Sequence, residues 1–122
     1  MSNGFLQLDG KSILIFGVAN KKSVACHIAQ AVREAGGRCV FVVQNETIRQ
    51  SVEKLVGGPT DLHVCDVEHE SQIVQLAETL AARGERFHGL VHSIAFADYA
   101  DGMKPFHETP KKAFLQAVDI SC

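Results

Sequence analysis

The chain has 122 residues, enough for one domain built around a single hydrophobic core. Apolar residues make up 46% and charged residues 21%, proportions typical of a soluble globular protein. The formal net charge of −2 gives no electrostatic reason to expect nucleic-acid or membrane binding, and no apolar run approaches the roughly 18 residues of a membrane span. The N-terminus lacks a signal-peptide pattern, so we expect a cytoplasmic protein.

The first half of the chain alternates apolar runs with helical patterns. Residues 12–16 form a continuous apolar run, which is typical of a strand buried on both faces. Helical periodicity follows over residues 23–35, and a pair of glycines ends it. A second apolar run covers residues 39–43, after which Asn45 can cap another helix that stops at Gly57-Gly58-Pro59. The residues expected to face inward from these helices are Ala25, Ile28, Ala29, Val32, Ile48, Val52, Leu55 and Val56.

The second half continues the alternation. A short strand is expected at residues 62–65, a helix at 69–83 and a fourth strand at 90–93. After a loop, Thr109 is expected to cap a last helix with Pro110 at its first position. The expected inward stripe of the third helix is Ile73, Leu76, Ala77 and Leu80. This order predicts an α/β fold, a Rossmann-like doubly wound parallel sheet of order 3-2-1-4, with residues 1–122 as one dinucleotide-binding unit.

The turn after the first strand is a candidate phosphate site. A strand-to-helix turn presents unpaired N–H groups and the positive end of the helix dipole. The usual G-x-G-x-x-G pattern is incomplete, because the chain has Gly17 but then Ala19 and Ser23. The P-loop pattern also fails. A plain turn with Ser23 as helix cap therefore remains an alternative for this segment alone.

The segment after the fourth strand is expected to lie next to the turn after the first strand. In a 3-2-1-4 sheet the first and fourth strands are neighbours, and their connections leave to opposite faces. The turns at Gly17 and Ser93 should therefore frame one cleft. Small residues at positions 95 and 97 would let a flat ring approach the backbone. Together, the two segments indicate a dinucleotide site.

These segments also carry a family resemblance. Gly17-Val18-Ala19-Asn20-x-x-Ser23-Val24-Ala25 and Val91-His92-Ser93-Ile94-Ala95-Phe96-Ala97 resemble two motifs of bacterial enoyl-acyl-carrier-protein reductases, the NADH-dependent enzymes of fatty-acid synthesis. Residues 44–45, 65–67 and 119–121 fit the same family, so the resemblance covers the whole chain. Ordinary short-chain dehydrogenases more often show T-G-x-x-x-G-I-G and N-N-A-G at the two main motifs.

The resemblance implies roles for twelve positions. Gly17, Ala19, Ser23 and Val24 would approach the pyrophosphate and ribose, Gln44 the adenosine ribose, Asp66 and Val67 the adenine, Ser93, Ile94 and Ala95 the nicotinamide, and Phe96 and Ala97 the acyl pocket. Three of these have ordinary alternatives: a turn carboxylate at Asp66, a packed loop anchor at Phe96 and a solvent-facing side chain at Gln44.

Charge after the second strand bears on the choice of cofactor. A 2′-phosphate needs Arg or Lys just past that strand, whereas a free ribose needs an acceptor. Gln44-Asn45-Glu46 offers no cation, and Arg49 comes a helical turn later. The sequence therefore favours NADH over NADPH.

The implied activity is reduction of the trans-2 double bond of enoyl thioesters on acyl carrier protein, by a homo-oligomer that the resemblance makes a tetramer. The family's catalytic tyrosine and lysine come later than the last helix, and Tyr99 is followed by Lys104 at the wrong spacing. We therefore assign no catalytic residue and expect residues 1–122 alone to be inactive, with an exposed edge on the fourth strand. A short-chain dehydrogenase acting on a carbonyl or alcohol, and an inert nucleotide-binding module, remain alternatives.

The remaining reactive side chains have ordinary interpretations. The four cysteines form no C-x-x-C pair and should be reduced. His88 and His92 do not make a convincing zinc set with Cys65, so no metal is expected. Lys104 and Lys111-Lys112 are better explained as a solvated surface than as a carrier-protein site.

Overall fold

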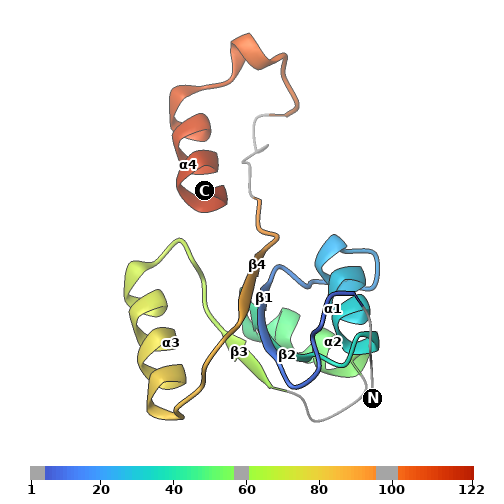
Figure 1. Cartoon of the computed structure of the whole chain (residues 1–122). Helices are drawn as coiled ribbons and strands as arrows, with labels where there is room; N and C mark the ends of the chain where they lie inside the picture. The colour runs from blue at the N-terminus through green and yellow to red at the C-terminus, as the bar shows by residue number, and fades with distance from the viewer. Residues whose placement is uncertain (1–4, 57–60, 96–101) are drawn as a thin grey trace.

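The computed structural model describes residues 5–56, 61–95 and 102–122. Within this part of the chain, four parallel strands form one sheet in the order β3-β2-β1-β4 (Figure 1). The strands are β1 (Ser12–Phe16), β2 (Arg38–Val43), β3 (Leu62–Val64) and β4 (Gly89–His92). The predicted fold class and strand order are therefore confirmed.

Helices pack on both faces of the sheet, α1 (Val24–Glu34) and α2 (Glu46–Leu55) on one and α3 (Glu70–Ala82) on the other. The short 3₁₀ helix η1 (Phe106–Glu108) and α4 (Lys111–Ser121) follow β4 and contribute no residue to either core. One core lies between the sheet and α1 and α2, with Ile15, Phe41 and Val52 fully buried in it. A smaller core lies between the other face and α3, around Val40 and Leu76. No described helix has both the length and the apolar character needed to cross a bilayer.

The ends of α1 and α2 follow from their sequence. Gly36 has a φ of +89°, and its N–H donates to the Arg33 carbonyl while the Gly37 N–H donates to that of Val32. This is a Schellman ending, which glycine favours because it lacks a Cβ. At the start of α2, Asn45 accepts the Ile48 N–H at 2.9 Å, as the sequence predicts.

We expect Asn45→Ala to lower the free energy of unfolding by about 1 kcal/mol, the usual cost of losing a helix cap. The Ile48 N–H then loses its acceptor. Urea denaturation followed by circular dichroism measures the change. Thr47→Ala, at an exposed position in the same turn, is the matched control and should change stability by less than half as much. Equal effects of the two substitutions would contradict the cap assignment.

The start of α4 differs from the prediction. Thr109 does not cap the helix. Instead, Pro110 occupies the cap position, with a φ of −60° and an extended ψ of 142°, and its carbonyl accepts the Phe114 N–H. The 3₁₀ turn η1 ends just before Thr109, whose own N–H donates to Phe106. The hydroxyl therefore lies one residue too early to close the first turn of the helix.

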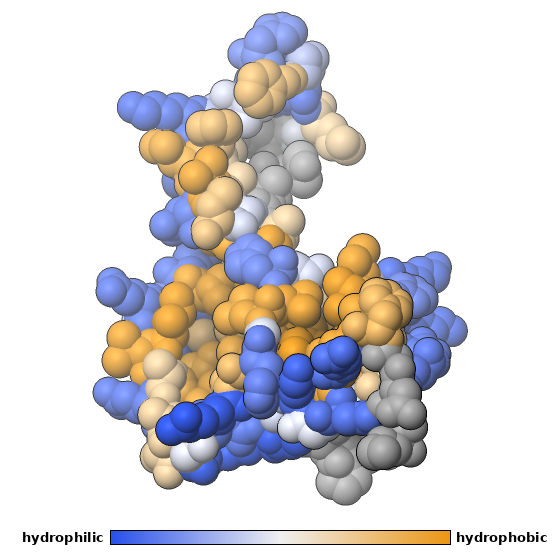
Figure 2. Space-filling view, viewed as in Figure 1, coloured by the Kyte–Doolittle hydropathy of each residue, from blue (hydrophilic) through white to orange (hydrophobic). Residues whose placement is uncertain are grey.

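The inward face of α3 is also narrower than predicted. Leu76 and Leu80 are buried, but Ile73 is 44% exposed and Ala77 is exposed. Ile73 lines a cavity of about 550 Å³ between α3, β4 and the end of α4, which no described residue fills. Leu90, on the β4 edge, is 59% exposed. Figure 2 shows apolar surface across the middle of this face and on α4.

Candidate dinucleotide site

The strand register brings four loops to one edge of the sheet. Phe16, the last residue of β1, is paired with Val42 of β2 and with His92 of β4. Val43, at the end of β2, is paired with Val64, at the end of β3. The segments that follow these strands therefore leave the sheet at the same level. In open α/β sheets, this carboxyl edge is where ligands bind.

The turns at Gly17 and Ser93 are in direct contact. The Ser93 N–H donates to the Phe16 carbonyl at 3.2 Å, which extends the β1–β4 pairing by one residue. Gly17 has a φ of +107°, and a Cβ on it would lie 2.0 Å from the Ser93 carbonyl oxygen. The close approach therefore requires glycine at this position. The central prediction from sequence, that these two turns meet, is confirmed.

Side-chain hydrogen bonds hold the rest of the first loop. The Ser23 hydroxyl donates to the Asn20 carbonyl at 2.7 Å, and the Asn20 amide oxygen accepts the Lys22 N–H at 2.8 Å. Ser23 occupies the cap position of α1, but its side chain accepts no N–H from the helix. The hydroxyl therefore shapes the loop and leaves the first-turn N–H groups of α1 uncapped by it. Ser23 therefore stands at the start of the helix, as the plain-turn alternative predicts, but its side chain does not cap the helix.

A cavity of about 200 Å³ opens where the loops converge. Eight of the predicted site residues line it: Gly17, Ala19, Gln44, Asp66, Val67, Ser93, Ile94 and Ala95. Ser23 and Val24 are not among its lining residues, and the Val24 side chain is 67% exposed. Phe96, Ala97 and Tyr99 lie outside the described residues.

Other lining residues were missed from the sequence. Phe16 and Ile48 contribute apolar side chains to the cavity wall. Both could have been found from the sequence, because Phe16 directly precedes the turn at Gly17 and Ile48 comes shortly after Gln44. Ile120 is different, because it comes from the end of α4, far along the chain. It is only 8% exposed, although most of α4 is open to solvent. No local pattern shows that this helix end reaches the cavity.

The segment after β3 combines a turn with a cavity wall. An Asp66 carboxylate oxygen accepts the Glu68 N–H at 3.1 Å, and the Asp66 N–H donates to Gln72 at 2.8 Å. Asp66 is therefore a turn carboxylate as well as a lining residue. Asp66, Glu68 and His69 place potential ligand atoms within 4.8 Å of one another, but two of them are exposed, and we assign no metal to them.

Cys65 forms part of the cavity floor and is 3% exposed. Burial raises the pKa of its thiol, and the neighbouring Asp66 charge raises it further. The thiol therefore stays protonated at neutral pH and behaves as a small apolar group. All four cysteines are unpaired, as predicted.

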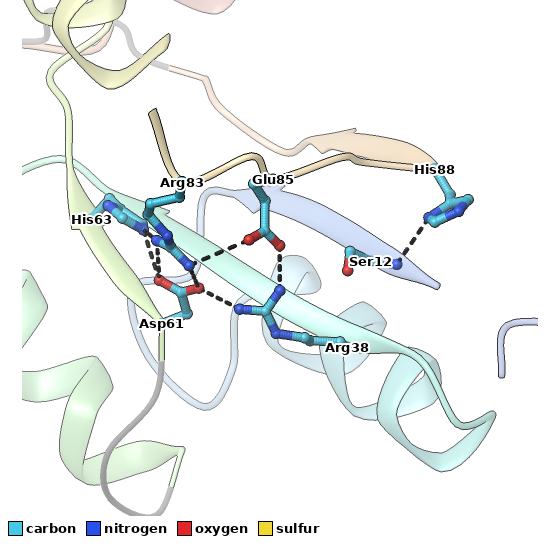
Figure 3. Close-up of polar contacts among 7 residues, drawn as sticks. All are labelled: Ser12, Arg38, Asp61, His63, Arg83, Glu85 and His88. Carbon is cyan, nitrogen blue, oxygen red and sulfur yellow. Dashed lines mark hydrogen bonds and ion pairs between the residues drawn. The ribbon is translucent and has the colours of Figure 1, made fainter. Parts of the chain in front are cut away.

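A second polar cluster lies at the opposite, amino end of the strands (Figure 3). The Asp61 carboxylate contacts Arg38 at 2.7 Å, Arg83 at 2.5 Å and His63 at 2.7 Å. The Glu85 carboxylate forms ion pairs with the same two arginines. The hydrogen bond from the Arg83 guanidinium is the main reason why the pKa of the Asp61 carboxyl is lowered to about 2. Partial burial acts to raise this pKa, and the hydrogen bond with His63 lowers it further. This cluster ties β2, β3 and the segment after α3 together, away from the cavity.

Nearby, the backbone N–H of Ser12 donates to Nδ1 of His88 at 3.1 Å. In return, the backbone N–H of His88 donates to the Ser12 carbonyl. This side chain completes the start of the β1–β4 pairing (Figure 3). It faces away from the cavity edge, so His88 has a structural explanation.

The geometry of the cavity suits a flat, extended ligand. Its walls are mainly apolar, and the polar side chains among its lining residues are those of Gln44, Asp66, Glu68 and Ser93. Ser93 and Ala95 are small, so a ring can approach the backbone beside Gly17. Among the described lining residues, no side chain forms a nucleophile–base pair. The arrangement can hold and orient a cofactor rather than perform acid–base chemistry itself.

Comparisons with known proteins agree with this geometry. Residues 17–122 match the family model described as "Enoyl-(Acyl carrier protein) reductase". The chain is 33% identical over 118 residues to the enoyl-[acyl-carrier-protein] reductase [NADH] FabI of Bacillus subtilis, with 93% of this chain and 46% of the relative covered. It is 33% identical over 120 residues to the NADPH-named enzyme of Staphylococcus aureus, with 95% of this chain and 47% of that relative covered.

A solved structure supports the same assignment. The crystal structure of FabI from Candidatus Liberibacter asiaticus superimposes with a TM-score of 0.88 at 35% identity, and covers 100% of this chain and 47% of its own. The chain thus spans about half the length of the relatives that it matches. The family match separates it from the ordinary short-chain dehydrogenases that the sequence left open. The chain belongs to the enoyl-(acyl carrier protein) reductase family.

Proposed function

We propose that this chain supplies the cofactor-binding half of an enoyl-acyl-carrier-protein reductase, which reduces the trans-2 double bond of enoyl thioesters. The observation that carries the proposal is the contact between the turns at Gly17 and Ser93 beneath one cavity. Eight residues chosen from the sequence for cofactor contacts line that cavity. Relatives of this chain are named as NADH- or NADPH-dependent reductases of enoyl-acyl-carrier-protein.

The chain's own residues would divide the work of binding. Gly17 and Ala19, with Ser23 and Val24 at the start of α1, would hold the pyrophosphate and ribose. Gln44 would hold the adenosine ribose, Asp66 and Val67 the adenine, and Ser93, Ile94 and Ala95 the nicotinamide. When bound, the reduced nicotinamide supplies the hydride for the double bond. Phe96 and Ala97 would border the acyl group of a thioester carried by acyl carrier protein.

We propose NADH as the cofactor rather than NADPH. Gln44 lines the cavity directly after β2, where it can accept a hydrogen bond from a ribose hydroxyl. Neither Asn45 nor Glu46, the next two residues, provides a cation for a 2′-phosphate. The relatives are divided on this point, since the Bacillus subtilis enzyme is named for NADH and the Staphylococcus aureus enzyme for NADPH. A homotetramer follows from the resemblance alone and a cytoplasmic location from the N-terminal sequence, and both are part of the same proposal.

Binding of NADH tests the proposal directly. We expect the folded chain to enhance the fluorescence of NADH in a saturable titration, and Ala95→Leu to weaken binding at least tenfold, because the added carbons occupy the cavity that Ala95 lines. Ala81→Leu, on the exposed face of α3, is the matched control and should bind as the wild type does. A folded wild type with no saturable binding, or an unchanged Ala95→Leu, would contradict the proposal.

Turnover is expected to be absent in the same sample. With a crotonyl thioester added, NADH should be bound but not oxidised, because the chain has a single tyrosine, Tyr99, and it is not followed by lysine at the family's spacing. Absorbance at the nicotinamide band follows the reaction. Measurable oxidation would show that the assignment of the catalytic groups to a later segment is wrong.

A further inference from the structure

The first turn of α2 lies at the rim of the cavity. Gln44 and Ile48 line it, and Glu46 is the first residue of the helix, directly after the Asn45 cap. Glu46 Oε1 and Arg49 Nη1 form an ion pair at 3.0 Å. The side chains are 61% and 39% exposed. Neither Glu46 nor Arg49 lines the cavity, but their ion pair lies in the helical turn that directly follows Gln44, the residue proposed to hold the adenosine ribose.

The residues directly after β2 bear on whether NADH or NADPH is bound, because the two cofactors differ by the 2′-phosphate on the adenosine ribose. A 2′-phosphate needs a cation close to the end of β2, and arginine is suited to it because its planar donors match phosphate oxygens. Within residues 44–49, Arg49 is the single cation. Its guanidinium already donates to Glu46. To reach a phosphate, Arg49 would have to leave this partner, and the phosphate would still face the negative charge of Glu46.

We propose, on the basis of the cofactor assignment above, that Glu46 is a specificity-determining residue. It restrains Arg49 and repels a 2′-phosphate, so the pair disfavours NADPH without contributing to the binding of NADH. Gln44 then supplies the favourable contact with the free ribose, and Glu46 supplies the discrimination. The cation needed for NADPH is present in the sequence but is held by an acid three residues before it.

Glu46→Gln tests this directly, because it removes the charge and keeps the shape. We expect the ratio of the NADPH to the NADH dissociation constant to fall roughly five- to twentyfold, the range of one charge-assisted phosphate contact. The dissociation constant of NADH should change by less than about twofold. Competition by adenosine 2′,5′-bisphosphate against adenosine 5′-diphosphate isolates the phosphate from the nicotinamide ring, and this measurement needs no turnover.

Three further variants separate the two effects of Glu46. Glu46→Gln combined with Arg49→Gln should lose most of the gained NADPH affinity, since the released cation is gone. Arg49→Gln alone should leave the ratio within about twofold of wild type, because Arg49 is already engaged. Glu53 lies four residues after Arg49 and could pair with the guanidinium that Glu46→Gln releases. Combining Glu53→Gln with Glu46→Gln should therefore maintain or increase the fall in the NADPH-to-NADH ratio of dissociation constants. Glu78→Gln, on exposed α3, is the charge-matched control.

The outcomes distinguish this inference from the proposed function. If wild-type chain fails to bind NADH, the cofactor assignment itself fails. If NADH binds normally but Glu46→Gln leaves the NADPH ratio unchanged, Glu46 has no selective role and the inference is overturned. A large loss of NADPH affinity in Arg49→Gln alone would also overturn it, since Arg49 would then already serve the phosphate.

Discussion

Gly17→Ala should lower the free energy of unfolding by about 3 kcal/mol or more and abolish detectable binding of NADH. The new Cβ would lie 2.0 Å from the Ser93 carbonyl oxygen and 2.7 Å from its carbon, so one of the two turns must move. The φ of +107° adds backbone strain for any residue with a side chain. Both turns line the cavity, so their separation changes the site directly. Urea denaturation and a fluorescence titration measure the two losses.

Gly84→Ala separates the effect of backbone strain at a positive φ from the effect of the steric clash between a Cβ and its neighbours. Gly84 has a φ of +68°, so alanine is strained there too, but no atom lies within 4 Å of the position of its Cβ. We expect a loss of about 1 kcal/mol at this site, the cost of the left-handed conformation alone. Binding of NADH should be unchanged because Gly84 follows the end of α3 and does not line the cavity. Equal losses in the two variants would show that the turns at Gly17 and Ser93 are not in contact.

The first loop of the candidate site keeps its shape with a single glycine. Among the described residues of this loop, only Gly17 has a positive φ. Ala19 therefore adopts a conformation open to any residue. The hydrogen bonds of Asn20 and Ser23 supply the shape that extra glycines provide in the usual pattern. The absence of G-x-G-x-x-G from the sequence was thus a poor argument against a phosphate-binding turn.

The sheet could be predicted from the sequence because its signals are local and agree with each other. Continuous apolar runs such as Ser12–Phe16 and Arg38–Val43 are separated by amphipathic helices, and this order leaves few topologies. The same reasoning found eight of the residues that line the candidate cavity, because those residues follow strand ends. Errors occurred at the boundaries: Cys65 lies just outside β3, and β4 begins at Gly89.

Features that depend on tertiary contacts were not predictable in the same way. The burial of Ile120 depends on where α4 lies, and the exposure of Ile73 depends on a space between elements. Helical periodicity gives the apolar side of a helix but not the presence of a neighbour to cover it. The start of α4 shows a different limit, because Pro110 is compatible with both the cap and the first helical position and only its ψ decides between them.

The amino-end cluster gives the clearest case of a long-range feature without a sequence signal. Its members come from the start of β2, the residue before β3, β3 itself, the end of α3 and the loop that follows (Figure 3). No two members of the cluster are three or four residues apart, the spacing of a helical ion pair; Arg83 and Glu85 are separated by two. Opposite charges pair with each other at this end of the sheet, whereas the candidate cavity lies at the carboxyl end.

Asp61→Asn should destabilise the chain at neutral pH and much less in acid. Asp61 has a folded-state pKa of about 2 against an ordinary value of 3.8, so its interactions stabilise the folded chain above pH 4 and are lost as the pH falls towards 2. The shift corresponds to about 2 kcal/mol at most, and the exposure of Arg38 and Arg83 reduces our expectation to about 1–2 kcal/mol. Urea midpoints of wild type and variant, measured between pH 7 and pH 3, give the difference.

The shape of that pH dependence is the critical result. The difference between wild type and Asp61→Asn should be constant from pH 7 to about pH 5 and should then narrow. The reason is that Asp61 of the unfolded chain takes up a proton around pH 3.8, whereas the folded chain keeps this carboxylate ionised down to about pH 2. Arg83→Gln removes the group that lowers the pKa of Asp61 most, so the variant should be less stable than wild type at pH 7 and should lose less stability on acidification. Glu78→Gln, with no partner in the cluster, should follow the wild-type curve. A difference between wild type and Asp61→Asn that stays the same down to pH 3 would mean that the ion pairs around Asp61 do not stabilise this end of the sheet.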